Sequence, residues 1–340
     1  MKEIYFASAN GYRGFRSYFN EVFSEEGLDK LFILKGGPGT GKSTLMKRLA
    51  EHFSGITDRC ELILCSSDKD SLDGVILTKR DKRVAMIDGT APHMMDTKFP
   101  GAVSEIINLG EGWDSGALTL RKSEILSLTE KKAELYKEGY EALRLAGYIK
   151  HRILSIVRRH FDKKRAEISA RILLSENEAV TAKSGVKLLS SFSKIGSFSL
   201  PLTGEDNEIR IYGKHYSAEI YLSLLKNYAE PRGLIKTVIP SSLDEDMTMG
   251  IITKGRAYVI GSDGICAEEF LSDPTPEETE EISKLEDMHE GILSLAARYF
   301  SGASERHFLL EDIYSTYMNY EANDKKLEDI KLITSRVLDI

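Results

Sequence analysis

The chain has few cysteines and no cysteine motif. Its 340 residues include three, at Cys60, Cys65 and Cys266. None belongs to a CxxC pair, which argues against zinc-ribbon and thioredoxin-type sites, and an odd number cannot pair completely within one chain. We therefore expect free thiols in a reducing compartment.

The chain also lacks long apolar runs and an excess of positive charge. No stretch approaches the roughly 20 apolar residues that span a bilayer, and the N-terminal sequence lacks the apolar core of a signal peptide. The formal net charge of −7 argues against a nucleic-acid or anionic-membrane surface. These absences predict a cytoplasmic protein without a membrane or nucleic-acid partner.

The remaining composition is that of an ordinary globular protein, with 41% hydrophobic and 29% charged residues. A chain of this length is typical of two domains. We predict one domain over residues 1–168 and a second over residues 169–340. Composition leaves the oligomeric state open.

A complete P-loop motif lies in the first half. Leu31–Leu34 is a short apolar run typical of a buried parallel strand, and Leu45–Ala50 alternates apolar and basic residues as the start of a helix does. Between them, residues 36–43 read GGPGTGKS and match GxxxxGK(S/T) in the strand–loop–helix context that the motif requires. The motif predicts a site for a purine nucleoside triphosphate, ATP with Mg²⁺.

The residue types of this motif suit a polyphosphate. Glycines let backbone N–H groups wrap around the anion, and the following helix directs its N-terminal dipole at it. We expect Lys42 to reach the β- and γ-phosphates, Ser43 to ligate Mg²⁺ and Thr44 to contact the α-phosphate. The predicted nucleotide-binding residues are Gly37, Pro38, Gly39, Thr40, Gly41, Lys42, Ser43 and Thr44.

An apolar strand that ends in an acid, Val84–Asp88, follows about 45 residues later. This is the Walker B pattern, in which Asp88 holds the Mg²⁺ shell opposite Ser43 and joins Lys42 as a catalytic residue. Gly89 stands where many hydrolysing ATPases place a glutamate, and the sequence has no LSGGQ-like signature. The sequence therefore predicts slow hydrolysis.

Three further acids, Asp68, Asp70 and Asp73, follow the preceding strand, at the carboxyl edge where open α/β sheets bind ligands. They suit either a catalytic role, for which Asp68 is the candidate, or the role of a helix cap or of a solvated loop. His93 is interpreted as a structural histidine, with a phosphate sensor as the alternative.

The chain shows an internal repeat at a spacing of roughly 170 residues. The matched segments are 4–10 with 171–177, 65–76 with 240–252, and 84–89 with 257–262. With Gly213 aligned on Gly36, Glu219 falls at the position of Lys42, where a carboxylate would repel a triphosphate. The other replacements are Ile220 for Ser43 and Gly261 for Asp88. We predict a strand, a loop and a helix over residues 208–226 that bind no nucleotide.

Two helical stretches are expected, over 123–170 and 277–338, and the second starts near Pro274 and Pro276. The first is basic over 150–165, as a solvated helix face would be; the alternative is an arginine that reaches the γ-phosphate. The segment 175–207 is interpreted as loop and domain boundary.

These motifs carry a resemblance. Within residues 5–114, the segments SANGYRGF, ILKGGPGTGKSTLMK, SSDKDSLDG, MIDGTAPH and FPGAVSEIINLGEGWD resemble a poorly characterised family of bacterial ATPase-like proteins. The resemblance implies ATP binding and two tandem P-loop domains, the second of which has a degenerate loop in this chain.

The predicted fold is α/β, with two tandem P-loop NTPase-type, three-layer parallel-sheet domains and helical extensions. The leading function is a slow ATPase or ATP-operated switch whose second half binds no nucleotide and offers a surface to a protein partner. One alternative is a small-molecule or nucleotide kinase in which Asp68 or Asp70 orients the acceptor hydroxyl. The other is a non-catalytic structural module that binds ATP.

Overall fold

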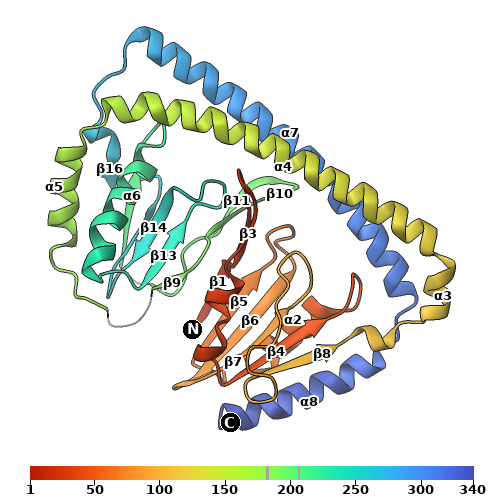
Figure 1. Cartoon of the computed structure of the whole chain (residues 1–340). Helices are drawn as coiled ribbons and strands as arrows, with labels where there is room; N and C mark the ends of the chain where they lie inside the picture. Colours follow the sequence, from red (N-terminus) through yellow and green to blue (C-terminus); the bar gives the residue numbers. More distant parts are fainter. Residues whose placement is uncertain (181–183, 206) are drawn as a thin grey trace.

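The computed structural model describes residues 1–180, 184–205 and 207–340. The protein is an α/β protein with two mixed six-stranded sheets, one in each half of the chain. Two long helices, α4 (Lys122–His160) and α7 (Pro276–Thr316), run side by side and connect the two sheets (Figure 1).

The first sheet has the strand order β1-β5-β6-β7-β4-β8. Its strands are β1 (Lys2–Phe6), β4 (Lys30–Lys35), β5 (Arg59–Leu64), β6 (Leu72–Lys79), β7 (Lys82–Asp88) and β8 (Ser104–Asn108). Strand β1 pairs in parallel with β5, and β4 pairs in parallel with both β7 and β8. Strand β6 runs antiparallel to both of its neighbours.

The expectation of a purely parallel sheet is therefore wrong. Strands β6 and β7 are joined by a tight turn at Arg80 and Asp81, on either side of which Lys79 pairs with Lys82. Such a turn can only reverse the chain, because a parallel partner requires a crossover of a dozen or more residues.

The second sheet repeats the arrangement of the first. Its order is β16-β12-β15-β14-β13-β9, and each neighbouring pair keeps the direction of its counterpart. Its strands are β9 (Gly185–Val186), β12 (Glu208–Tyr212), β13 (Thr237–Pro240), β14 (Thr248–Ile252), β15 (Ala257–Ile260) and β16 (Ile265–Cys266). The two halves share one sheet topology, as the internal repeat predicts.

The second repeat begins later than the sequence match placed it. Residues 171–174 lie in helix α5 (Lys163–Leu174), where Ala166, Ala170 and Leu174 are buried at helical spacing while Ile172 is exposed. The match of 4–10 with 171–177 is therefore wrong. The interpretation of 175–207 as loop is also wrong, because this segment holds β9 and a hairpin.

Each half carries a small hairpin after its first strand. The hairpin strands are β2 (Ser8–Gly11) and β3 (Gly14–Ser17) in the first half, and β10 (Ser190–Ser193) and β11 (Gly196–Ser199) in the second. The Asn10 amide donates to the Phe192 carbonyl, 182 residues away, and Phe6 exchanges two backbone hydrogen bonds with Leu188 at the same spacing. Equivalent residues meet in this way on a two-fold axis, so the halves are related by approximate two-fold symmetry.

Helices α4 and α7 pack antiparallel along their length. Gly139 allows close contact, because a Cβ there would lie 2.6 Å from the Phe300 ring. Further along, the Arg159 guanidinium pairs with Glu278. Helix α7 begins where the sequence predicts, at a capping box formed by Thr275 and Glu278.

The last helix of each repeat packs on the sheet of the other repeat. Helix α5 packs against α6 (Ser217–Ala229) in the core of the second sheet. Helix α8 (Glu321–Val337) packs against α2 (Lys42–His52) in the core of the first. Figure 1 shows α5 beside α6 and α8 along the first sheet. Neither core is complete without a helix from the other repeat.

Main-chain hydrogen bonds join the two segments that pass between the halves at each end of the α4–α7 pair, and the pattern is the same at both ends. They join residues 112–114 with 317–319 at one end, and residues 160–162 with 270–272 at the other. The remaining helices are short: α1 (Phe19–Val22) and α3 (Ser115–Leu120). Among the helices of the described residues, none has the length and apolar character needed to cross a membrane.

Because α8 completes the first core, we expect Leu327→Ala to lower the free energy of unfolding by about 2–5 kcal/mol. Leu327 is fully buried, whereas Leu332 on the same helix is 56% exposed. The matched control Leu332→Ala should change the free energy of unfolding by less than ~0.5 kcal/mol. Urea denaturation followed by circular dichroism measures both, and equal losses would contradict the packing of α8.

Candidate functional site

The first loop, Gly36–Gly41, connects β4 to α2. Gly39 and Gly41 have φ angles of 69° and 82°, in the left-handed region that residues with a Cβ rarely adopt. Gly41 is the N-cap of α2, so the free backbone N–H groups of the first helical turn lie beside the loop. The loop and the helix start together form an anion-binding geometry.

Lys42 is held at the centre of this loop. Its Nζ donates to the carbonyl oxygens of Gly36 (2.8 Å) and Gly37 (2.9 Å), and lies 3.7 Å from Asp88 Oδ2. Both charged side chains are mostly buried. An incoming phosphate must therefore compete with two carbonyls and one carboxylate for the Lys42 ammonium.

Asp88 lies at the carboxyl end of β7, and Ser43 lies in the first turn of α2. Strands β4 and β7 pair in parallel with Leu34 opposite Asp88, which places the carboxylate beside the first loop. Asp88 Oδ1 accepts from the Thr90 backbone N–H (2.9 Å) and hydroxyl (2.6 Å), and Ser43 Oγ accepts from the Leu72 N–H (2.9 Å). Hydroxyl and carboxylate oxygens are the donors that Mg²⁺ prefers, so these residues fit the ion.

His93 contacts residues of two neighbouring strands, Asp88 of β7 and Asp73 of β6. Its Nδ1 lies 3.1 Å from the Asp88 carbonyl oxygen, its Nε2 lies 3.3 Å from Asp73 Oδ2, and its ring stacks on Phe19. Burial lowers the pKa of His93, but the hydrogen bond and charge of Asp73, with the charge of Asp88, raise it above the ordinary value. These contacts support the structural interpretation of His93.

Asp68 makes its contacts within its own turn. Its carbonyl accepts from the Ser71 N–H, and its carboxylate accepts from the Asp70 N–H at 3.3 Å. The Asp70 carbonyl accepts from Lys47, which ties the turn to α2. Among the described contacts, none joins Asp68 to Lys42 or Asp88, so the structure favours a turn role for this acid.

The second half covers the first loop. The Tyr320 hydroxyl donates to the Gly39 carbonyl (2.7 Å), and the Asn323 amide donates to the Thr40 carbonyl (3.0 Å). A Cβ at Gly39 would lie 2.8 Å from the Glu311 carbonyl oxygen. Residues from α7 and α8 therefore touch the loop directly.

Glu311 also brings a carboxylate to this loop. Its interaction with His307, whose Nε2 lies 3.6 Å from Glu311 Oε1, is the main cause that lowers its pKa, and the Lys42 charge and the Gly39 backbone lower it further. Sequence reasoning missed Glu311, Tyr320 and Asn323. They carry no local motif, and they lie hundreds of positions from the loop in the chain.

The second loop, Gly213–Tyr216, is reshaped. The structure confirms a strand, loop and helix here, since β12 leads into α6. Helix α6 follows Tyr216 in the left-handed conformation, as α2 follows Gly41, so this loop is two residues shorter than Gly36–Gly41. Ser217 therefore takes the position of Lys42, and the placement of Glu219 there is wrong by two residues.

The counterpart of Asp88 also differs from the sequence match. The Gly89 N–H donates to Leu34, and the Gly261 N–H donates to Ile211 in the same way. Gly261 therefore matches Gly89. Ile260, the last residue of β15, takes the position of Asp88.

A buried ion pair lies beside the second loop. Lys150 from α4 donates to Glu219 Oε2 at 2.8 Å, and its Nζ lies 4.5 Å from the centroid of the Tyr216 ring. Both charged groups are buried. The charge of Glu219 is therefore neutralised by Lys150 within the protein.

The basic segment 150–165 does not reach the first loop through its described contacts. Arg152 and Arg159 pair with acids of α7, and Arg165 donates to the Glu269 carbonyl. The structure thus favours a helix face that joins neighbouring helices over an arginine directed at a phosphate.

Comparisons with protein-family models, with curated proteins and with solved structures find no match to this chain. The candidate site is therefore defined by the geometry of its own residues.

Proposed function

We propose that the chain binds a purine nucleoside triphosphate, ATP with Mg²⁺, at residues 36–44 and acts as a slow ATPase or ATP-operated switch. One observation carries the proposal. Lys42, the first residue of α2, and Asp88, the last residue of β7, lie 3.7 Å apart beside the glycine loop that leads from β4 into α2. This is the arrangement that a P-loop site requires.

Each residue has a role in this proposal. Lys42 leaves the Gly36 and Gly37 carbonyls and binds the β- and γ-phosphates, while backbone N–H groups up to Thr44 surround the polyphosphate. Ser43 and Asp88 hold Mg²⁺, which when bound neutralises phosphate charge.

Slow turnover follows from the residues around the site. Gly89 follows Asp88 and offers no carboxylate to activate water. The acid that the second half brings to the loop is Glu311, whose carboxylate already interacts with His307. Because Glu311 lies near the end of α7, we expect the rate of hydrolysis to depend on the position of this end of the helix.

The contacts from the second half also support a switch. Tyr320 and Asn323 bind the carbonyls of Gly39 and Thr40, so a change in loop conformation alters the junction of α7 with α8. A ligand shifts such an equilibrium when it binds one conformation better than the other.

Phosphate release, measured with purified protein, ATP and Mg²⁺, separates the functional alternatives. Slow release that small-molecule or nucleotide acceptors leave unchanged supports the ATPase. Transfer that depends on an acceptor supports a kinase, and tight binding without turnover supports a structural module.

We expect Lys42→Ala to weaken ATP binding at least tenfold in a calorimetric titration, since it removes the cation that the phosphates require. The matched control is Lys47→Ala, which removes an exposed lysine from the same helix and should leave the affinity within about twofold. Circular dichroism checks that both variants fold. Unchanged affinity in folded Lys42→Ala would contradict the site.

We expect Asp88→Asn to weaken binding of Mg-ATP more than binding of ATP in EDTA. Asp88 is proposed to hold the metal, so its charge matters most when the metal is present. Titrations in the two buffers measure the difference, and Asp70→Asn in the adjacent exposed turn serves as the control. Equal losses in both buffers would assign Asp88 a structural role only.

A further inference from the structure

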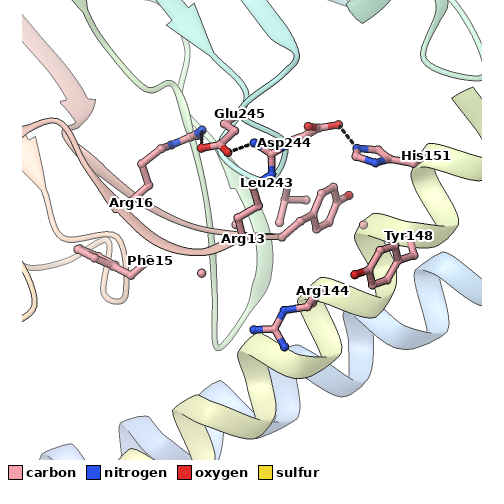
Figure 2. Close-up of a pocket in the computed structure, with 13 residues that line it drawn as sticks. Arg13, Phe15, Arg16, Arg144, Tyr148, His151, Leu243, Asp244 and Glu245 are labelled. Carbon is pink, nitrogen blue, oxygen red and sulfur yellow. Dashed lines mark hydrogen bonds and ion pairs between the residues drawn. The ribbon is translucent and has the colours of Figure 1, made fainter.

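A pocket of about 490 Å³ lies between the two halves, away from the first loop. Hairpin β2–β3, helix α4 and the turn at Leu243–Glu245 line it. Figure 2 shows His151 of α4 directed at Asp244 of the second half across this pocket.

The acidic turn in this pocket is the twin of the turn at Asp68. In both turns the first acid accepts from the N–H of the acid two residues later, at 3.3 Å for Asp68 with Asp70 and for Asp244 with Asp246. At the second turn, His151 of α4 lies 3.6 Å from Asp244. Among the described residues, His151, Asp244 and Asp246 form the one group of metal-binding side chains whose ligand atoms all lie within 4.8 Å of one another.

In this group, one carboxylate oxygen of Asp244 accepts no hydrogen bond within the described part of the chain. Its side chain is 4% exposed, yet its Oδ2 accepts no hydrogen bond from the described residues. The nearest cationic groups are His151 Nε2 at 3.6 Å and Lys150 Nζ at 3.8 Å, both beyond hydrogen-bond distance. A buried carboxylate oxygen that accepts no hydrogen bond is costly, so a bound ion or water that supplies this interaction would stabilise it.

One pair of these atoms has a spacing that suits a metal ion. Two ligand atoms bound at about 2.1 Å to a tetrahedral metal lie about 3.4 Å apart. The separation of 3.6 Å between His151 Nε2 and Asp244 Oδ2 is close to that value. One imidazole with two carboxylates favours zinc, manganese or cobalt over magnesium and calcium, which prefer oxygen ligands alone.

Two neighbouring cations, Lys150 and Arg13, already have partners. Lys150 is held by Glu219 at 2.8 Å. Arg13 donates to Asp246 Oδ2 at 2.6 Å and pairs with Glu245, which leaves Asp246 Oδ1 for a metal. A divalent cation at the site therefore competes for the carboxylates of Asp244 and Asp246 with two cations, Lys150 and Arg13, that also bind other acids.

We propose that His151, Asp244 and Asp246 bind one divalent first-row transition metal. The ion joins α4 of the first repeat to the acidic turn of the second, and its remaining coordination positions open into the pocket. The site is independent of the first loop and does not rest on nucleotide binding.

The test titrates Co²⁺ into metal-free protein without nucleotide, following visible d–d absorption, with Zn²⁺ calorimetry and thermal melting in parallel. We expect one equivalent to bind and to raise the melting temperature. His151→Ala and Asp244→Asn should weaken binding at least tenfold. His151 is 49% exposed, so its replacement leaves the core intact even if Asp244→Asn fails to fold.

Two control variants define specificity. Asp70→Asn, in the twin turn of the first half, and Asp88→Asn, at the proposed nucleotide site, should keep the wild-type affinity for Co²⁺. Failure of the wild-type protein to bind Co²⁺ and Zn²⁺ would overturn the proposal. Binding by folded His151→Ala with wild-type affinity would overturn it as well.

Discussion

The antiparallel packing of α4 against α7 allows each repeat to place its last helix on the opposite sheet. Both helices run past the centre of the molecule before they end, so α5 reaches the second sheet and α8 reaches the first. Gly139 permits the close contact with Phe300 that this pairing needs. The hydrophobic cores of the two halves depend on one another as a result.

The same exchange builds the candidate site from both repeats. The glycine loop, Lys42 and Asp88 come from the first repeat, whereas the residues that cover the loop come from the end of the second. Tyr320 lies at the start of α8, and its hydroxyl reaches Gly39 because α8 packs beside α2. A helix that completes a core thus also contacts the proposed nucleotide site.

The two loop regions use opposite charges. Around the first loop, the repeat itself supplies the cation Lys42 and the other repeat supplies the carboxylate of Glu311. Around the second loop, the repeat itself supplies the carboxylate of Glu219 and the other repeat supplies the cation Lys150. In the second region the two charges form a direct buried contact at 2.8 Å, whereas Lys42 in the first region lies 3.7 Å from Asp88 of its own repeat.

The sequence alone determined the features that depend on neighbouring residues. The glycines with positive φ, the start of α2 at Lys42, the acid that ends β7 and the capping box at Thr275 all follow from local backbone chemistry. The shared topology of the halves was also predictable, because polar features recur in the same order.

Only the tertiary structure decided which distant residues meet. Residues 171–174 have the apolar character of a strand, but packing on α6 makes them helical. The two-residue shortening of the second loop moves Glu219 away from the position of Lys42, and no ungapped sequence match detects that change. His151 approaches Asp244, and Tyr320 approaches Gly39, because α4 and α7 each carry the chain from one half to the other. Contacts of such long range are set by the burial of whole helices, and local sequence carries no signal for them.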